Sequence, residues 1–161
     1  LQNRNFKNIE LYIVGSPGEV DYDFELKEYV KSNGVDNIHF IPHNPYVKKI
    51  RKKCDIGLVC SVSEALGRVT IENMLAGCLT IGGNAGATTE LIDNGKNGLL
   101  YEIGNYKDLA DKIEYAIKNK EKSQEMINNA KRYAVDNFDI INYQKFINNL
   151  YNDIKNIKDL K

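Results

Sequence analysis

Two carboxylates, Glu64 and Glu72, flank the predicted start of a short helix in the run from Ser61 to Gly77. Amide groups at a helix start have no partner within the helix and lie at its positive end, where they suit phosphate. Carboxylate oxygens accept hydrogen bonds from sugar hydroxyl groups. These residue types and their spacing indicate a site for a phosphorylated sugar compound. On spacing alone, the alternative that Glu64 is a solvated cap residue and Glu72 a solvated helix residue is favoured over a binding role.

Gly67 stands where this helix is expected to begin, and glycine lets a backbone approach phosphate closely. We expect the amide groups from Leu66 to Val69 to point at the phosphate. Arg68 is either a charge-assisted contact to it or a surface cation. Glu72 lies further along the helix, where it could accept hydrogen bonds from a ribose diol.

A second loop, predicted over 82–86, is rich in glycine and precedes a short helix. Backbone amides from Gly86 to Thr88 could form a concavity that binds an anion. Thr88 or Thr89 is also a plausible N-cap for the helix. Glu90 is either a first-turn acid favoured by the helix dipole or a ligand contact.

These segments need a scaffold, and the apolar pattern predicts strands alternating with helices. Strands are expected at 10–15, 37–41, 55–60, 79–81 and 98–101, and helices at 19–32, 45–53, 67–76 and 88–93. This order is typical of an α/β fold with a Rossmann-like parallel sheet that has helices on both faces. Ligands of such sheets bind beyond the carboxyl ends of the strands, where both loops are expected.

The last third of the chain is predicted to be helical, with 121–161 as a C-terminal extension. Its apolar residues form three stripes, which we interpret as packing faces rather than cofactor sites. The stripes are Leu109, Ile113, Ala116 and Ile117; Ile127, Ala130, Ala134 and Phe138; and Tyr143, Phe146, Ile147, Leu150, Ile154 and Ile157.

Composition limits the classes of function. The 161 residues include 22 Lys and Arg against 22 Asp and Glu, which argues against a nucleic-acid-binding protein. The basic cluster at 48–53 is interpreted as the solvated face of a helix, with a patch that attracts anionic ligands or a membrane surface as the alternative. Three cysteines without metal-site spacing predict no disulfide scaffold and no metal centre, and favour the cytoplasm. Cys60 and Cys78 lie in apolar runs and are expected to be buried.

The run from Ser61 to Gly77, followed by a strand and by Gly86-Ala-Thr-Thr-Glu90, resembles the group 1 retaining glycosyltransferases of the GT-B fold. Glu64 and Glu72 match the Glu-x7-Glu motif of that family. The second loop matches the family's Gly-Gly-x-Pro-Glu loop with two replacements. The resemblance covers about residues 9 to 118 and identifies the chain as the C-terminal, donor-binding half of such an enzyme.

The resemblance implies roles for individual residues. Glu64 would contact the donor sugar as the catalytic glutamate, and Glu72 would bind the ribose hydroxyl groups. The amides from Gly67 to Val69 would hold the diphosphate. Candidates for contact with the nucleobase follow the second strand of the chain: Pro42, His43 and Val47. His43 is equally compatible with a plain surface loop residue.

The resemblance also implies what accompanies this domain. We expect a donor such as a UDP-sugar or GDP-sugar, no metal, and a hexosyltransferase reaction that retains anomeric configuration. The N-terminal acceptor-binding domain, and the first strand and helix that carry an Arg and a Lys for the diphosphate, are expected outside this chain. We therefore expect the chain alone to be inactive. Peripheral contact with the inner face of a membrane would come through the other domain.

Two other classes remain open at this point. One is a different enzyme on the same fold, such as a nucleotide-sugar epimerase or a phosphorylase, although no lysine motif for a phosphorylase cofactor is present. The other is a non-catalytic nucleotide-binding module. The sequence does not state the base, the sugar, the acceptor or the oligomeric state.

Overall fold

The computed structural model describes Phe6 and residues 8–15, 20–141, 144–145, 147–149, 151 and 155. The chain divides into two compact units, Leu1–Ile50 and Arg51–Lys161, called unit 1 and unit 2 below. Each unit has its own parallel sheet. The α/β class, with parallel strands alternating with helices, is confirmed, whereas the strands pair in two separate sheets.

Unit 1 contains a two-stranded sheet and helix α1. Its strands are β1, Leu11–Val14, and β2, Ile38–Ile41, which pair in parallel with Leu11 opposite Ile38. Helix α1 spans Val20–Ser32 between them, and α2, Val47–Arg51, follows β2. His39 of β2 contacts the Glu10 carboxylate.

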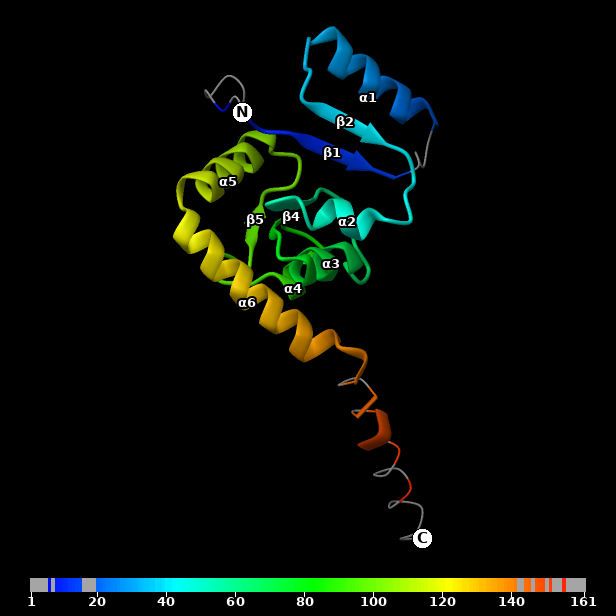
Figure 1. Ribbon diagram of the computed structural model, residues 1–161, viewed down its shortest axis with the longest axis vertical. Helices are drawn as coiled ribbons and strands as arrows, with labels where there is room; N and C mark the ends of the chain where they lie inside the picture. The colour runs from blue at the N-terminus through cyan, green and yellow to red at the C-terminus, as the bar shows by residue number, and fades with distance from the viewer. Residues whose placement is uncertain are drawn as a thin grey trace. The chain divides into compact units, whose positions relative to one another are not determined.

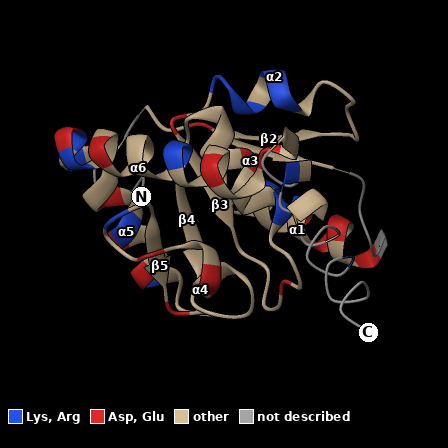
Figure 2. Cartoon of the chain, turned by 90° about the horizontal axis from the view of Figure 1, so that it is seen from below, with Lys and Arg blue, Asp and Glu red and all other residues tan. Residues whose placement is uncertain are grey.

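Unit 2 contains a three-stranded parallel sheet in the order β3-β4-β5, with helices after each strand. The elements are β3, Ile56–Val59; α3, Arg68–Ala76; β4, Leu79–Gly83; α4, Thr88–Leu91; β5, Leu99–Tyr101; α5, Tyr106–Lys118; and α6, Lys120–Phe138. Strands β3 and β4 carry no charged residue, and the charged residues lie on helices and loops around them (Figure 2). Such uncharged strands are typical of a parallel sheet whose faces are covered.

Helix α6 packs against α3 and contacts β4, so it helps to hold α3 in place (Figure 1). A buried apolar cluster joins these elements: Met74, Ile92, Ala130 and Ala134. The predicted packing face of Ile127, Ala130, Ala134 and Phe138 was partly wrong. Phe138 is 38% exposed, whereas Met126, which the prediction left out, is buried at 3% exposure. The third stripe lies almost wholly outside the described residues.

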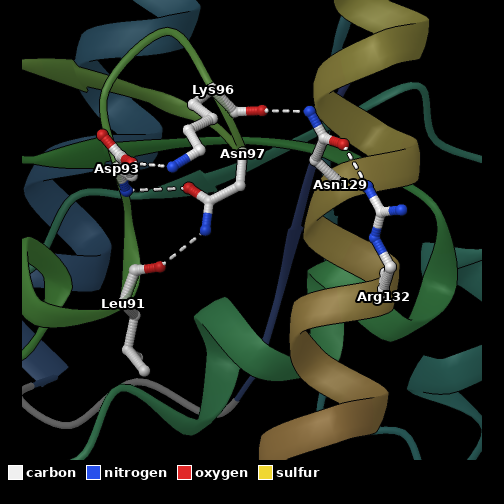
Figure 3. A network of polar contacts seen from close by, with 6 residues as sticks. All are labelled: Leu91, Asp93, Lys96, Asn97, Asn129 and Arg132. Carbon is white, nitrogen blue, oxygen red and sulfur yellow. Dashed lines mark hydrogen bonds and ion pairs between the residues drawn. The ribbon is translucent and has the colours of Figure 1, made fainter.

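A polar network fixes the segment after α4 to helix α6 (Figure 3). The Asn97 side chain donates to the Leu91 carbonyl and accepts from the Asp93 amide, at 3.1 and 2.8 Å. The Asn129 amide group of α6 donates to the Lys96 carbonyl at 3.0 Å. Because Asn97 is buried, its polar groups would lack partners without these hydrogen bonds. Together with the Asn129 bond, they hold the segment after α4 against α6.

Strand β4 is longer than expected, because Gly82 and Gly83 belong to it rather than to the glycine-rich loop. A Cβ on Gly82 would lie 2.4 Å from Thr88 Cγ2, and one on Gly83 would lie 2.8 Å from Ile103 Cγ1. Glycine serves here to admit neighbouring side chains onto a strand, not to make a turn. No helix within the described residues has the length and apolar character needed to cross a lipid bilayer.

Candidate functional site

Helix α3 begins at Arg68, as the sequence predicts, with Gly67 as its N-cap in the left-handed conformation at φ 68°. The Ile71 amide is bonded to the Gly67 carbonyl at 3.3 Å, so the amides of residues 68–70 precede the first bond within the helix. Because glycine has no side chain, the N-cap residue itself cannot cover these amides. They are the groups expected to bind an anion.

The start of α3 borders an open concavity of about 290 Å³ lined by the residues from Glu64 to Val69. The predicted Leu66, Gly67 and Arg68 all lie at this surface, and their role in binding stays a prediction. Leu66 and Val69 are exposed apolar side chains at its border. Arg68 is exposed and forms no ion pair with any residue that the structure describes, so its guanidinium remains available to an anion.

Gly67 has both a positive φ and a neighbouring side chain close to where a Cβ would lie. A Cβ at this position would lie 2.7 Å from Leu91 Cδ1, in addition to the strain of a positive φ. Leu91 of helix α4 therefore lies directly against the start of α3. The sequence indicates the need for glycine, but not the neighbour that imposes it.

Glu64 is held at both its side chain and its backbone. The Ser61 hydroxyl donates to Glu64 Oε1 at 2.8 Å, and the Ala87 amide donates to the Glu64 carbonyl at 2.9 Å. Gly86 lies so close that a Cβ there would be 2.8 Å from the Glu64 carbonyl oxygen. The second glycine loop thus fixes the backbone of the residue that is predicted to contact a sugar.

This arrangement changes the interpretation of the second loop. The Ala87 amide belongs to the predicted anion-binding concavity, yet it is already bonded to Glu64. The N-cap of α4 is Ala87, so the prediction of Thr88 or Thr89 was wrong. Thr88 is buried, and the Thr89 hydroxyl donates to the Gly86 carbonyl at 2.8 Å. Gly86 thus lies against Glu64, and its predicted contact with an anion stays a prediction.

Glu72 lies on the exposed side of α3 and forms an ion pair that the sequence does not indicate. Its Oε2 atom is 2.9 Å from Arg51 NH2; the Glu72 side chain is 49% exposed and that of Arg51 is 15% exposed. Interpreting the whole basic cluster as solvated was therefore wrong for Arg51. Arg51 is far from Glu72 in the chain, and no local spacing rule connects them.

Arg51 is held by its backbone as well. The Cys78 thiol donates to the carbonyls of Arg51 and Cys54, at 3.1 and 3.3 Å. Burial raises the pKa of Cys78 to about 11, which keeps this thiol protonated as a donor at neutral pH. Cys78 is buried as expected, but Cys60 is exposed at the end of β3, where it contacts Tyr101. Burial, the largest cause, raises the pKa of Tyr101 to about 12.

The three nucleobase candidates lie in unit 1, whereas Glu64, Glu72 and the α3 start lie in unit 2. Pro42 and His43 are exposed after β2, and Val47 begins α2. Their relation to the α3 start stays a prediction. In the part of the chain that the structure describes, no group of three His, Cys, Asp or Glu residues could hold a metal ion.

Comparison with known proteins identifies the family of this chain. The family model described as "Glycosyl transferases group 1" matches residues 1–133. The chain belongs to the group 1 glycosyltransferases. It is 28% identical over 128 residues to an uncharacterised glycosyltransferase of Methanocaldococcus jannaschii, covering 72% of this chain and 36% of that protein.

Solved structures match the fold of this chain. Anabaena HepE in complex with UDP-glucose is 28% identical with a TM-score of 0.83, covering 91% of this chain and 42% of HepE. The C-terminal domain of the group 1 glycosyltransferase LpcC from Francisella tularensis is 25% identical with a TM-score of 0.77, covering 85% and 73%. This glycosyltransferase chain therefore corresponds to the C-terminal, donor-binding domain of the GT-B fold, and it spans less than half the length of its curated relative.

Proposed function

We propose that this domain binds a nucleoside diphosphate sugar along the exposed side of α3, as the donor half of a retaining glycosyltransferase. The observation that carries the proposal is the uncapped start of α3, with one glutamate just before it and another on its exposed side. The α3 start would hold the diphosphate through the amides of residues 68–70 and the Arg68 guanidinium.

The spacing of the two glutamates fits the two ends of such a donor. Glu72 follows Arg68 by one turn, a rise of about 6 Å along the helix at 1.5 Å per residue, and it lies on the same side. A ribose joined to a diphosphate at the α3 start could reach the Glu72 carboxylate. Glu64 lies on the other side of Gly67, where its carboxylate would contact the transferred sugar.

The reaction proposed for the whole protein is transfer of a hexosyl group to an acceptor alcohol with retention of configuration. The HepE complex with UDP-glucose supports a UDP-hexose as the first donor to test. Positive groups at the α3 start would stabilise negative charge that develops on the leaving diphosphate. Acceptor binding is assigned to a second domain, since the chain spans 36% of its curated relative. Cytoplasmic action at a membrane face stays a prediction of the family resemblance.

Calorimetric titration of this chain with UDP, GDP and ADP tests the binding site and its base preference. Glu72→Ala should weaken binding of the preferred nucleotide about tenfold, because a ribose diol loses its acceptor. The control is Glu125→Ala, which removes another exposed helical glutamate, on α6, and should bind as the unmodified chain does. Equal affinities of the Glu72 and Glu125 variants would contradict the ribose assignment.

The sugar assignment needs a second comparison. Glu64→Ala should weaken binding of UDP-glucose more than binding of UDP, since only the former carries the sugar. A loss of equal size for both ligands would move Glu64 from sugar contact to support of the α3 start.

A further inference from the structure

Arg51 and Glu72 form an ion pair between a nearly buried partner and a half-exposed one. The guanidinium is 15% exposed and the carboxylate 49% exposed, with 2.9 Å between Arg51 NH2 and Glu72 Oε2. A surface pair of two mobile side chains contributes little, because both must be ordered to form it. Here one partner is already enclosed, so the pair restricts mainly the Glu72 side chain.

The backbone of Arg51 is fixed independently of this pair. Its carbonyl accepts hydrogen bonds from the Cys78 thiol at 3.1 Å and from the Cys54 amide at 3.0 Å. Cys78 lies directly after the glycine that ends α3, in the connection to β4. Arg51 is thus joined to the α3 segment at two places, through its side chain to Glu72 and through its carbonyl to Cys78.

The pair leaves acceptor capacity on Glu72. A carboxylate has about four lone-pair positions, and the contact with Arg51 uses one oxygen, Oε2. Glu72 also lies on the side of α3 that remains exposed, together with Arg68, Val69 and Leu75. A diol could therefore bind Oε1 while the guanidinium keeps its place on Oε2.

We propose that Arg51 is a positioning residue that holds the Glu72 carboxylate in one orientation for the cis-diol of a ribose. The inference rests on the proposed function, since it assigns a partner to the proposed ribose acceptor. Arg51 itself does not touch the ligand. Its contribution is that Glu72 is ordered before the nucleotide arrives, which lowers the entropy lost on binding.

The test compares two ligands that differ only in the diol: UDP and 2′,3′-dideoxy-UDP. Arg51→Met should weaken UDP binding by about tenfold, the effect of leaving one side chain to be ordered on binding. Binding of the dideoxy analogue should change less than about twofold, because no diol is present to use Glu72. The ratio of the two dissociation constants does not depend on the fraction of protein that is folded.

Two further variants complete the design. Arg51→Lys keeps a cation and should recover part of the UDP affinity, although an ammonium is not a planar, forked donor. Lys53→Met removes an exposed cation of the same cluster and should leave both affinities unchanged. Glu72→Ala should abolish the effect of Arg51→Met in the double variant, because Arg51 acts only through Glu72.

The outcomes separate the inference from the function on which it rests. Equal weakening of UDP and its dideoxy analogue by Arg51→Met would overturn the positioning role and show a general structural one. No change for either ligand would overturn it as well, while leaving nucleotide binding established. Failure of the unmodified chain to bind UDP, GDP or ADP would overturn the proposed function together with this inference.

Discussion

Helices α3 and α4 both follow a strand of the same sheet, and both begin after a glycine, yet their N-termini differ. Neither start has a side-chain cap, but the α3 start borders an open concavity. At the α4 start, the Ala87 amide is bonded to the Glu64 carbonyl at 2.9 Å. One helix start is open to a ligand, and the other is used to support the first.

The glycines at the two starts show the same division. Gly67 approaches a side-chain methyl group of Leu91, which can move, whereas Gly86 approaches the backbone of Glu64, which cannot move without its loop. A similar glycine pattern in the sequence can therefore mark a binding surface in one loop and a contact between loops in the other. Three substitutions test this comparison.

Gly86→Ala should have the largest effect on stability. The residue has φ 53°, and a Cβ would lie 2.8 Å from the Glu64 carbonyl oxygen. Left-handed strain and displacement of the Glu64 backbone should together lower the free energy of unfolding by about 2–4 kcal/mol, measured by urea denaturation. The control is Gly95→Ala, with φ 80° and open space, which should show the strain alone. Equal losses would mean that the two loops do not support each other.

Gly67→Ala should have a smaller effect, although its φ of 68° is similar. Leu91 can rotate away from the added methyl group, so the loss should stay near the strain of about 1–2 kcal/mol. Gly77→Ala, at φ 84° with open space around it, is the matched control at the other end of α3. A loss as large as that of Gly86→Ala would show that the α3 start is as closely packed as the second loop.

Arg68→Gln should have the smallest effect, and it should appear in binding rather than stability. Loss of one exposed charge-assisted contact should weaken UDP binding about fivefold, which is about 1 kcal/mol, and added salt should reduce the difference. Lys96→Gln is the control, since Lys96 follows α4 and pairs with Asp93 at 2.9 Å. If Lys96→Gln weakens binding as much, the effect of Arg68→Gln comes from loss of a surface charge and not from a contact at the α3 start.

Local signals in the sequence predicted much of this fold. The start of α3 after Gly67 and its end at Gly77 follow from turn and capping chemistry acting within a few residues. The uncharged strands β3 and β4 follow from apolar runs that only a covered sheet uses. The order of these elements placed Glu64 beyond a strand end and Glu72 within a helix, as the structure has them.

Errors arose where a residue's role depends on a distant neighbour. Gly82 and Gly83 resemble loop glycines in sequence, but they pair with β5 as strand residues. Side chains of Thr88 and Ile103 occupy the space that a Cβ would need. Cys60 continues an apolar run, yet it lies just past the last residue of β3 and is exposed. Whether such a residue is buried depends on which element packs against it in the fold, and the spacing of apolar residues in the sequence does not specify that.

By itself, the sequence determined the α/β class, the order of elements, and a helix start flanked by two glutamates, since all three depend on short-range patterns of apolar residues and glycine. Only the tertiary structure decided how the two glutamates are held. Glu64 is fixed by Ser61 nearby and by the loop at Gly86 and Ala87, and Glu72 is paired with Arg51. Hydrogen bonds and ion pairs between distant segments depend on their separation in space, which chain spacing does not give.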